Sequence, residues 1–370
     1  MNSICHISSA HYRNDTRIFL KEAVSLSKAG FKTSFIVLDE MEDEIKEGVK
    51  IINANLSKKK LSVFKRLFIG SFLIYRKLKF LKPKVIHFHD PELIILGIFL
   101  KFKKYKVIYD IHENTAHQIL SKQKIPKIFR RLISIAFGLF EKLSVKAFDF
   151  LIYATPGIEE NFSRRNSNSK VINNFPIVGD LDKTVKNNNK FDEVIFLGGI
   201  NSIRGIETLV KSLEYAKVKL NLVGNFLEKN LKNKLQRLDG WQYVNYHGFC
   251  EREKSSKIIS RSSAGLVTFY EAPNHMRSQP NKLFEYMCCG IPVIASYFPL
   301  WKLIVESNKC GICVNPNNPR EIARAINFLQ KNPKKAMLMG KKGREAVLKK
   351  YNWVLEEKKL IELYKKLLSL

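Results

Sequence analysis

Short apolar runs alternate with longer amphipathic stretches along most of the chain. Residues 3–8 form a first apolar run, residues 16–29 form an amphipathic stretch that ends at Gly30, and residues 32–38 form the next run. Short runs rich in β-branched residues are typical of strands, and apolar positions three and four apart are typical of helices. The pattern therefore predicts the strand, helix and strand that open a parallel sheet.

The same alternation continues through both halves of the chain. Strands that run into helices are predicted at residues 84–97 and 106–114, and residues 179–190 are a polar, Asn- and Lys-rich linker. We therefore expect an α/β protein of two doubly wound domains. The expected boundaries are residues 1–178 for the first domain, residues 190–351 for the second, and residues 352–370 for a final helix.

Polar groups concentrate around residues 279–296, QPNKLFEYMCCGIPVIAS, which predict a loop, a helix of about three turns and a buried strand. Pro280 suits the first helical turn, and Gly290 suits the position just past the last turn. A helix N-terminus attracts phosphate, and Lys282 adds a full positive charge there. Glu285 can accept hydrogen bonds from a diol such as ribose. The alternative is an ordinary surface pair of Lys282 and Glu285 on a core helix.

A second glycine-rich segment follows the first predicted strand of the second domain. The sequence EVIFLGGINSIRGIETLV indicates a strand, the pair Gly198 and Gly199, and a helix from about Gly205. Glycines let the backbone approach a ligand closely, and Arg204 at the helix start is suited to neutralising a diphosphate.

Polar side chains also lie at the ends of predicted strands in the first domain. They are Asp15 and Arg17; His87, His89 and Asp90; and Asp110, His112, Glu113 and Asn114. Ligands of open α/β sheets bind beyond the carboxyl ends of strands. The alternatives are a helix cap for Asp15 and packed core histidines. We expect no metal here, because zinc spacings such as H-E-x-x-H are absent from the sequence.

The segment PNKLFEYMCCGIPVIAS resembles the C-domain signature of the family 4 glycosyltransferases, which have the GT-B fold. The resemblance covers nearly the whole chain. It implies two Rossmann-like domains facing across a cleft, with the final helix crossing back to the first domain. It also implies retaining, front-face transfer from a nucleoside-diphosphate sugar, with a UDP-sugar favoured, and with no cofactor or obligatory metal.

The resemblance assigns roles to residues of both domains. In the family, the Glu matching Glu285 binds the ribose hydroxyls, a basic residue at the position of Arg204 contacts the phosphates, and the His matching His112 lies over the donor sugar and acceptor. Arg277 stands where many members carry a second Glu that contacts the sugar, and members that build O-antigen and capsule often lack that Glu. Gly198 stands where many members carry Arg.

The candidates follow from these motifs and this resemblance. The catalytic candidates are His112, Arg204 and Lys282. The donor-binding candidates are Gly198, Gly199, Arg204, Arg277, Pro280, Asn281, Lys282, Leu283 and Glu285. The acceptor-side candidates are Asp15, Arg17, His89, Asp90 and Glu113.

The chain is strongly basic, with 64 Lys and Arg against 34 Asp and Glu, a net charge of +30. This charge predicts an anionic partner surface. Two long basic and aromatic helices are predicted at about residues 61–81 and 126–148; Lys59, Arg66 and Lys77 fall within about 20° on a helical wheel. Such helices either lie in a bilayer interface or cover a sheet.

Neither a secretory signal nor an apolar stretch of ~18 to 20 residues is visible in the sequence. We therefore expect a cytoplasmic bacterial enzyme at the inner face of the plasma membrane, acting on a lipid-linked glycan in surface polysaccharide synthesis. One alternative is a nucleic-acid-binding protein, which no recognised motif supports, so no nucleic-acid partner is expected. The other is an epimerase or phosphorylase of the same fold. The six cysteines predict free thiols.

Overall fold

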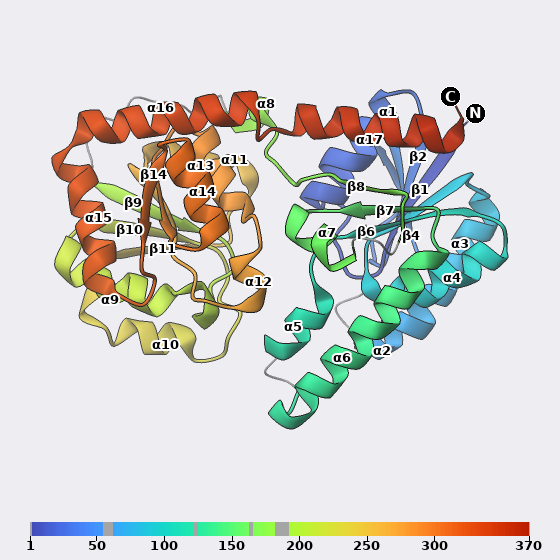
Figure 1. Ribbon diagram of the computed structural model, residues 1–370, viewed down its shortest axis with the longest axis horizontal. Coiled ribbons are helices and arrows are strands. Elements are labelled where there is room, and N and C mark those ends of the chain that lie inside the picture. Colours follow the sequence, from blue (N-terminus) through green and yellow to red (C-terminus); the bar gives the residue numbers. More distant parts are fainter. Residues whose placement is uncertain (1, 55–61, 122–124, 163–165, 182–191, 370) are drawn as a thin grey trace. The chain divides into compact units, whose positions relative to one another are not determined.

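The chain forms two compact units, Met1–Asn174 with Val354–Leu370, and Phe175–Trp353. Both are seen in the ribbon of the computed structural model (Figure 1). The structure describes residues 2–54, 62–121, 125–162, 166–181 and 192–369.

The first unit is built on an eight-stranded sheet in the order β3-β4-β2-β1-β5-β6-β7-β8. Its strands are β1 (Ser3–Ser8), β2 (Lys32–Val37), β3 (Glu44–Lys46), β4 (Val49–Asn53), β5 (Val85–Phe88), β6 (Lys106–Ile111), β7 (Phe150–Tyr153) and β8 (Ser169–Val171). All neighbours pair in parallel except β3 with β4. Phe35 and Ile36 belong to separate apolar clusters, because consecutive side chains point to opposite faces and helices cover both faces.

Helices connect these strands. They are η1 (Thr16–Ala23), α1 (Val24–Lys28), α2 (Val63–Lys65), η3 (Arg66–Gly70), α3 (Ser71–Leu81), η4 (Pro91–Leu93), α4 (Ile94–Phe102), α5 (Thr115–Ser121), α6 (Lys127–Ser144), η5 (Val145–Ala147) and α7 (Pro156–Phe162). The last helix, α17 (Trp353–Leu368), returns to the first unit as expected. There the Tyr364 hydroxyl lies 2.8 Å from His87 Nδ1, and Glu356 accepts the Asn173 amide hydrogen at 2.9 Å.

The second unit holds a six-stranded parallel sheet in the order β11-β10-β9-β12-β13-β14. Its strands are β9 (Glu193–Leu197), β10 (Lys219–Val223), β11 (Val244–Gly248), β12 (Ala264–Val267), β13 (Val293–Ser296) and β14 (Gly311–Val314). Its helices are α8 (Val178–Leu181), η7 (Ser202–Arg204), α9 (Ile206–Ala216), α10 (Leu231–Gln236), η8 (Asp239–Tyr243), α11 (Arg252–Arg261), α12 (Pro273–Met276), α13 (Asn281–Cys288), α14 (Pro299–Ser307), α15 (Pro319–Lys331) and α16 (Pro333–Lys349). Two Rossmann-like α/β units therefore make up the fold, as the alternating pattern predicts.

Several local predictions differ from the structure. Helix α13 spans only eight residues, about two turns, because Pro280 lies at its N-cap and outside the first turn. The prediction for Gly290 is confirmed, since it ends the helix with φ +71°. The strands β3 and β4 and the helix α5 were not predicted. Most of the predicted linker, and Lys59, lie outside the described residues.

All six cysteines are free, as expected. Across the described parts of the chain, the helices are too short or too polar to span a bilayer.

Candidate active site

The strand order of the second sheet places a binding position at the end of β9. The chain adds β10 and β11 on one side of β9 and β12 to β14 on the other, and open α/β sheets bind ligands where the order reverses in this way. The segment after β9 carries Gly198, Gly199 and Arg204, and α13 begins beyond the end of the neighbouring strand β12. The donor-binding candidates of both motifs therefore lie along one edge of the sheet.

Arg204 folds back over the glycine pair. Its Nη1 donates to the Gly199 carbonyl oxygen at 3.0 Å, and its guanidinium lies over the Phe269 ring, 5.3 Å from the centroid. Gly198 has φ +142°, and a Cβ there would lie 2.9 Å from Arg204 Nη1. The absence of a side chain at Gly198 thus leaves space for the Arg204 guanidinium. A larger residue at position 198 would displace Arg204 from this position.

The first turn of α13 presents backbone amides and a cation. None of the described side chains caps this turn by a hydrogen bond, so its amide hydrogens can bind an anion. Lys282 Nζ donates to Glu285 Oε2 at 2.7 Å, and both side chains are partly exposed. Leu283 is buried beneath them, whereas Asn281 and Arg277 are exposed.

Tyr286 joins α13 to the glycine segment. Its hydroxyl accepts the Leu197 amide hydrogen at 2.9 Å, and burial raises the pKa of this hydroxyl. Its ring fills the space above Gly265, where an added Cβ would lie 2.1 Å from it. Sequence reasoning missed Tyr286 and Phe269, because both look like ordinary apolar core positions in the sequence.

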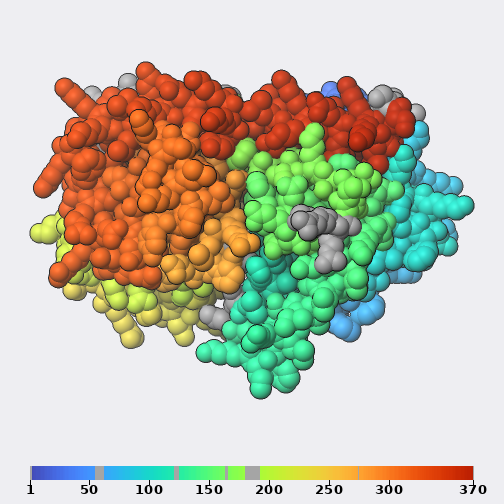
Figure 2. Space-filling view, viewed as in Figure 1, coloured from blue at the N-terminus to red at the C-terminus, as the bar shows by residue number. Residues whose placement is uncertain are grey.

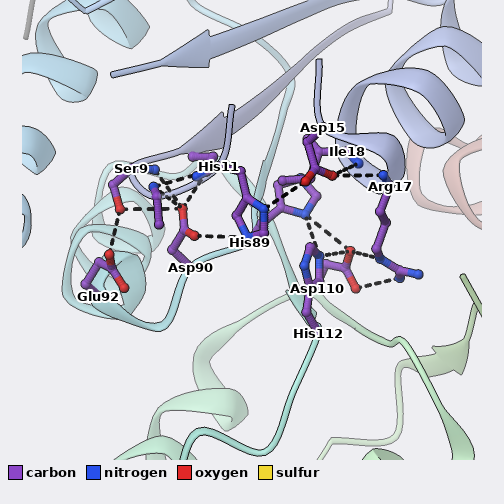
Figure 3. A network of polar contacts seen from close by, with 12 residues as sticks. Ser9, His11, Asp15, Arg17, Ile18, His89, Asp90, Glu92, Asp110 and His112 are labelled. Atoms are coloured by element: carbon purple, nitrogen blue, oxygen red, sulfur yellow. Dashed lines mark hydrogen bonds and ion pairs between the residues drawn. The ribbon is translucent and has the colours of Figure 1, made fainter. Parts of the chain in front are cut away.

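In the first unit, polar side chains meet beyond the carboxyl ends of the neighbouring strands β1 and β5, where the strand order reverses (Figure 3). Asp15 caps η1, since its Oδ1 accepts the amide hydrogens of Arg17 and Ile18 at 2.8 and 2.9 Å. The alternative of a helix cap is therefore what the structure shows. Asp15 Oδ2 also lies 3.0 Å from His11 Nδ1. Burial opposes ionisation of Asp15, but His11 and the Ile18 amide lower its pKa overall.

Arg17, an acceptor-side candidate, lies inside the first unit. It is 4% exposed, and its Nε and Nη2 donate to Asp110 at 2.9 and 2.8 Å. Its Nη1 donates to the Ile172 carbonyl oxygen at 2.8 Å. Burial works against ionisation of Asp110, yet the Arg17 charge and His112 hold its pKa well below the usual range. Arg17 and Asp110 form a buried ion pair that positions other groups.

The Asp110 carboxylate fixes the ring tautomers of a histidine chain. Its Oδ2 lies 2.8 Å from His112 Nε2 and 3.2 Å from His89 Nδ1, and a carboxylate only accepts, so both nitrogens donate to it. Burial lowers the pKa of His89 to about 4, so this ring is neutral and its Nε2 accepts. His6 Nδ1, at 3.0 Å, therefore donates to His89 Nε2. His112 is partly exposed and held in a fixed orientation.

Asp90 is a second buried carboxylate that positions the loop after β1. It accepts hydrogen bonds from the Ser8 hydroxyl at 2.7 Å and the Ser9 amide at 2.6 Å. His11 Nε2 lies 3.5 Å from its other oxygen, so His11 is held between Asp15 and Asp90. Sequence reasoning missed His11, which lies in the middle of a loop and at no predicted strand end.

The acceptor-side candidates thus divide by burial. Arg17, His89 and Asp90 are buried. Asp15 is half-buried and Glu113 is exposed. The exposed edge of this cluster therefore consists of His11, His112 and their neighbours. Two groups of these side chains could hold a metal ion: His6, Glu22, His87 and His89, and His89, Asp110 and His112.

The sequence of this chain is similar to that of known glycosyltransferases. Residues 179–346, which include all the donor-binding candidates, match the family model Glycosyl transferases group 1. The uncharacterized glycosyltransferase MJ1069 of Methanocaldococcus jannaschii is 25% identical over 290 residues, 72% of this chain and 69% of that protein.

Solved structures share the fold over the full length. Sucrose-phosphate synthase from Thermosynechococcus elongatus is 20% identical with a TM-score of 0.79, and 100% of both chains is covered. Anabaena HepE in complex with UDP-glucose is 16% identical with a TM-score of 0.71, again over 100% of both chains. The chain therefore has the GT-B fold, and the family match over residues 179–346 and the Methanocaldococcus relative support glycosyltransferase activity.

Proposed function

We propose that the protein is a retaining family 4 glycosyltransferase that uses a UDP-sugar and a lipid-linked glycan acceptor in bacterial surface polysaccharide synthesis, such as that of O-antigen or capsule. The observation that carries the proposal is the donor-side arrangement of the second unit. The glycine turn with Arg204 and the uncapped first turn of α13 with Lys282 lie along one edge of a parallel sheet.

This arrangement suits a nucleoside diphosphate. Amide hydrogens, Arg204 and Lys282 supply fixed positive potential where negative charge grows on the departing diphosphate, which lowers the barrier to transfer. Glu285 accepts hydrogen bonds from the ribose hydroxyls. The resemblance assigns the sugar and acceptor to His112, whose orientation is fixed by Asp110. Structures of HepE with UDP and with UDP-glucose support the choice of UDP.

The surface of α6 supports a membrane-linked acceptor. Figure 1 shows α6 extending away from the first sheet, and Figure 2 shows the same segment protruding at the bottom of the view. Its buried residues are Ser134, Glu141 and Ser144, whereas Leu132, Leu139 and Leu143 are 65%, 59% and 64% exposed. On a wheel of 3.6 residues per turn, these leucines fall within about 40° of one another and on the side opposite Glu141. The apolar stripe of α6 therefore faces away from the sheet.

Basic side chains border this stripe. Arg131 is exposed and Lys142 half-buried, and both fall about 60 to 120° from the leucines on the wheel. An apolar stripe with a basic border fits the interface of an anionic bilayer better than nucleic acid, which offers no apolar layer. Arg66, one of the three basic residues expected to share a face of the helix at 61–81, donates from Nε to Glu92 at 2.9 Å.

Donor choice is tested by calorimetry and thermal shift with nucleotides and nucleotide-sugars. A ligand at 100 times its Kd adds ~2.7 kcal/mol to stability, so the cognate UDP-sugar should raise the unfolding midpoint clearly. Sugar transfer is then assayed with that donor and polyprenyl-diphosphate-linked acceptors in detergent, and the anomeric configuration of the product is read by NMR. An inverted product, or conversion of the donor without transfer to any acceptor, would reject the proposal.

Membrane docking is tested by sedimentation with vesicles of neutral or anionic lipid. The double variant Leu132→Ser, Leu139→Ser should lose binding to anionic vesicles while keeping donor affinity. Its matched control is Leu338→Ser, Leu348→Ser, which removes two half-exposed leucines from α16 of the second unit. If both double variants bind anionic vesicles like the wild type, α6 is not the docking surface.

A further inference from the structure

Among the described residues of the first unit, three buried side-chain atoms without a hydrogen-bond partner lie close together. They are His6 Nε2, His87 Nε2 and Glu22 Oε2, whereas the other Glu22 oxygen is paired with Arg17. Nearly all buried polar atoms in folded proteins have a hydrogen-bond partner, so orphans gathered in one place call for a bound species. Together with His89, these residues each offer a ligand atom within 4.8 Å of the others.

The surrounding hydrogen bonds engage Nδ1 of both histidines and leave Nε2 of each as the available ligand atom. His6 Nδ1 donates to His89 Nε2, so His6 Nε2 carries no hydrogen and points its lone pair into the cluster. His87 Nδ1 is anchored to the Tyr364 hydroxyl at 2.8 Å, which leaves His87 Nε2 as its second nitrogen. A neutral imidazole whose other nitrogen is anchored in this way is the form that binds metal ions.

We propose that His6 Nε2, His87 Nε2 and the Glu22 carboxylate bind a divalent transition-metal ion of the zinc class in the core of the first unit. Two imidazoles and one carboxylate are a ligand set that zinc prefers. Magnesium and calcium prefer oxygen ligands alone, so they do not fit. The ion joins β1, β5 and η1 and has a structural role that is separate from sugar transfer.

The geometry distinguishes Glu22 Oε2 as the coordinating oxygen. Oε1 lies 3.1 Å from Arg17 Nε, whereas Oε2 faces His87 Nε2 at 4.0 Å. Burial and the nearby Asp110 favour the protonated carboxyl of Glu22 in the metal-free protein, with its pKa raised well above the usual value. Metal binding therefore replaces this proton, which is released to solvent.

The neighbouring group of His89, Asp110 and His112 is a weaker candidate. His112 Nε2 and His89 Nδ1 already donate to Asp110 Oδ2 at 2.8 and 3.2 Å, and Asp110 also accepts from Arg17. A metal ion there would have to break these bonds. At the proposed site, His6 Nε2 and His87 Nε2 have no such partners. Their other ring nitrogens are bonded to His89 and Tyr364, which orient the two rings.

The first experiment asks whether the wild-type full chain, produced without a polyhistidine tag, binds a metal ion. Elemental analysis of protein purified from zinc-supplemented medium should give nearly equimolar zinc. Protein from cobalt-supplemented medium should show the visible d–d absorption of cobalt bound by nitrogen and oxygen. Removal of the ion with a chelator should lower the unfolding midpoint by several degrees, and added zinc should restore it. Wild-type protein that takes up neither ion at stoichiometry overturns the proposal and assigns the orphans to buried water.

Variants locate the ion. His87→Gln should lose the zinc and the cobalt spectrum, whereas His247→Gln, which changes a histidine of the second unit bonded to Asn221 at 2.9 Å, should retain both. Glu22→Gln is a second variant that keeps the shape and neutrality of the protonated side chain, so it should fold yet bind zinc at least tenfold more weakly. Full zinc content in both His87→Gln and Glu22→Gln would overturn the proposed site.

Discussion

Replacing Arg17 with leucine should destabilise the first unit by about 3–5 kcal/mol. Arg17 is buried and donates two hydrogen bonds to Asp110, at 2.9 and 2.8 Å, and one to the Ile172 carbonyl oxygen, at 2.8 Å. The leucine side chain replaces none of these bonds. Asp110 would keep the two histidine donors His89 and His112 but lose its cation. Most of the cost is that of a buried carboxylate left without its cation.

The loss should depend on pH. In the wild type, Arg17 outweighs burial and lowers the pKa of Asp110, so this pair stabilises the fold above the unfolded pKa of aspartate and less as pH falls. In the leucine variant burial raises the Asp110 pKa, and protonation at lower pH relieves the unpaired charge. The difference in stability between wild type and variant should therefore be larger at about pH 8 than at about pH 5.

The three tryptophans allow the two units to be followed separately. Trp241, Trp301 and Trp353 all lie in the second unit, so their fluorescence reports on that unit, whereas far-UV circular dichroism reports on both. In urea titrations, Arg17→Leu should move the unfolding of the first unit to lower urea. This unfolding is the part of the dichroism transition that has no matching change in fluorescence. Arg76→Leu, at an exposed position of α3, should stay within about 0.5 kcal/mol of wild type. A loss below about 1 kcal/mol in Arg17→Leu would refute the argument that the buried pair is irreplaceable.

Other substitutions test the two units. Glu285→Ala should weaken nucleotide binding by ~1.5 to 3 kcal/mol in calorimetry, whereas Glu253→Ala, which removes a Lys–Glu pair of similar length on α11, should not; equal affinities would remove Glu285 from the site. Arg204→Ala and Lys282→Ala should each lower kcat on the order of 10² to 10³-fold, and a rise in KM alone would mean ground-state binding. Burial raises the pKa of Glu141 to about 7, so the wild type loses stability as pH rises through that value. Glu141→Gln should then be stabilising, relative to wild type, at about pH 8 and not at about pH 5; the same difference at both pH values would contradict this.

The strands could be predicted from the sequence because both faces of these sheets are buried. A parallel strand covered on both sides reads as a continuous apolar run, and β1 has the predicted bounds. The edge strand β3 does not read this way, since its Ile45 is 78% exposed. The end of α13 was predicted because Gly290 needs positive φ. Its start was not, since Pro280 is compatible with both the N-cap and the first turn.

The donor side was more accessible to sequence reasoning than the acceptor side, because its signals are local. The glycine pair and Arg204 lie within seven consecutive residues, 198–204, and a turn followed by a helix can be read from such a segment. The sequence does not reveal which distant residues hold this segment in position. The bond between Tyr286 and the Leu197 amide joins residues 89 positions apart, and it depends on how α13 packs against the sheet.

Strand register explains why the histidine cluster of the first unit could not be predicted. His87 and His89 are two residues apart, so their side chains point to the same face of the sheet. The parallel pairing of β1 with β5 places His6 directly beside His87, and the pairing of β5 with β6 brings Asp110 beside His89. These registers join segments separated by 81 and 21 positions, and a shift of one residue would move every member to the other face. Sequence alone identifies polar residues near strand ends, whereas register decides that they form one buried cluster with orphaned ligand atoms.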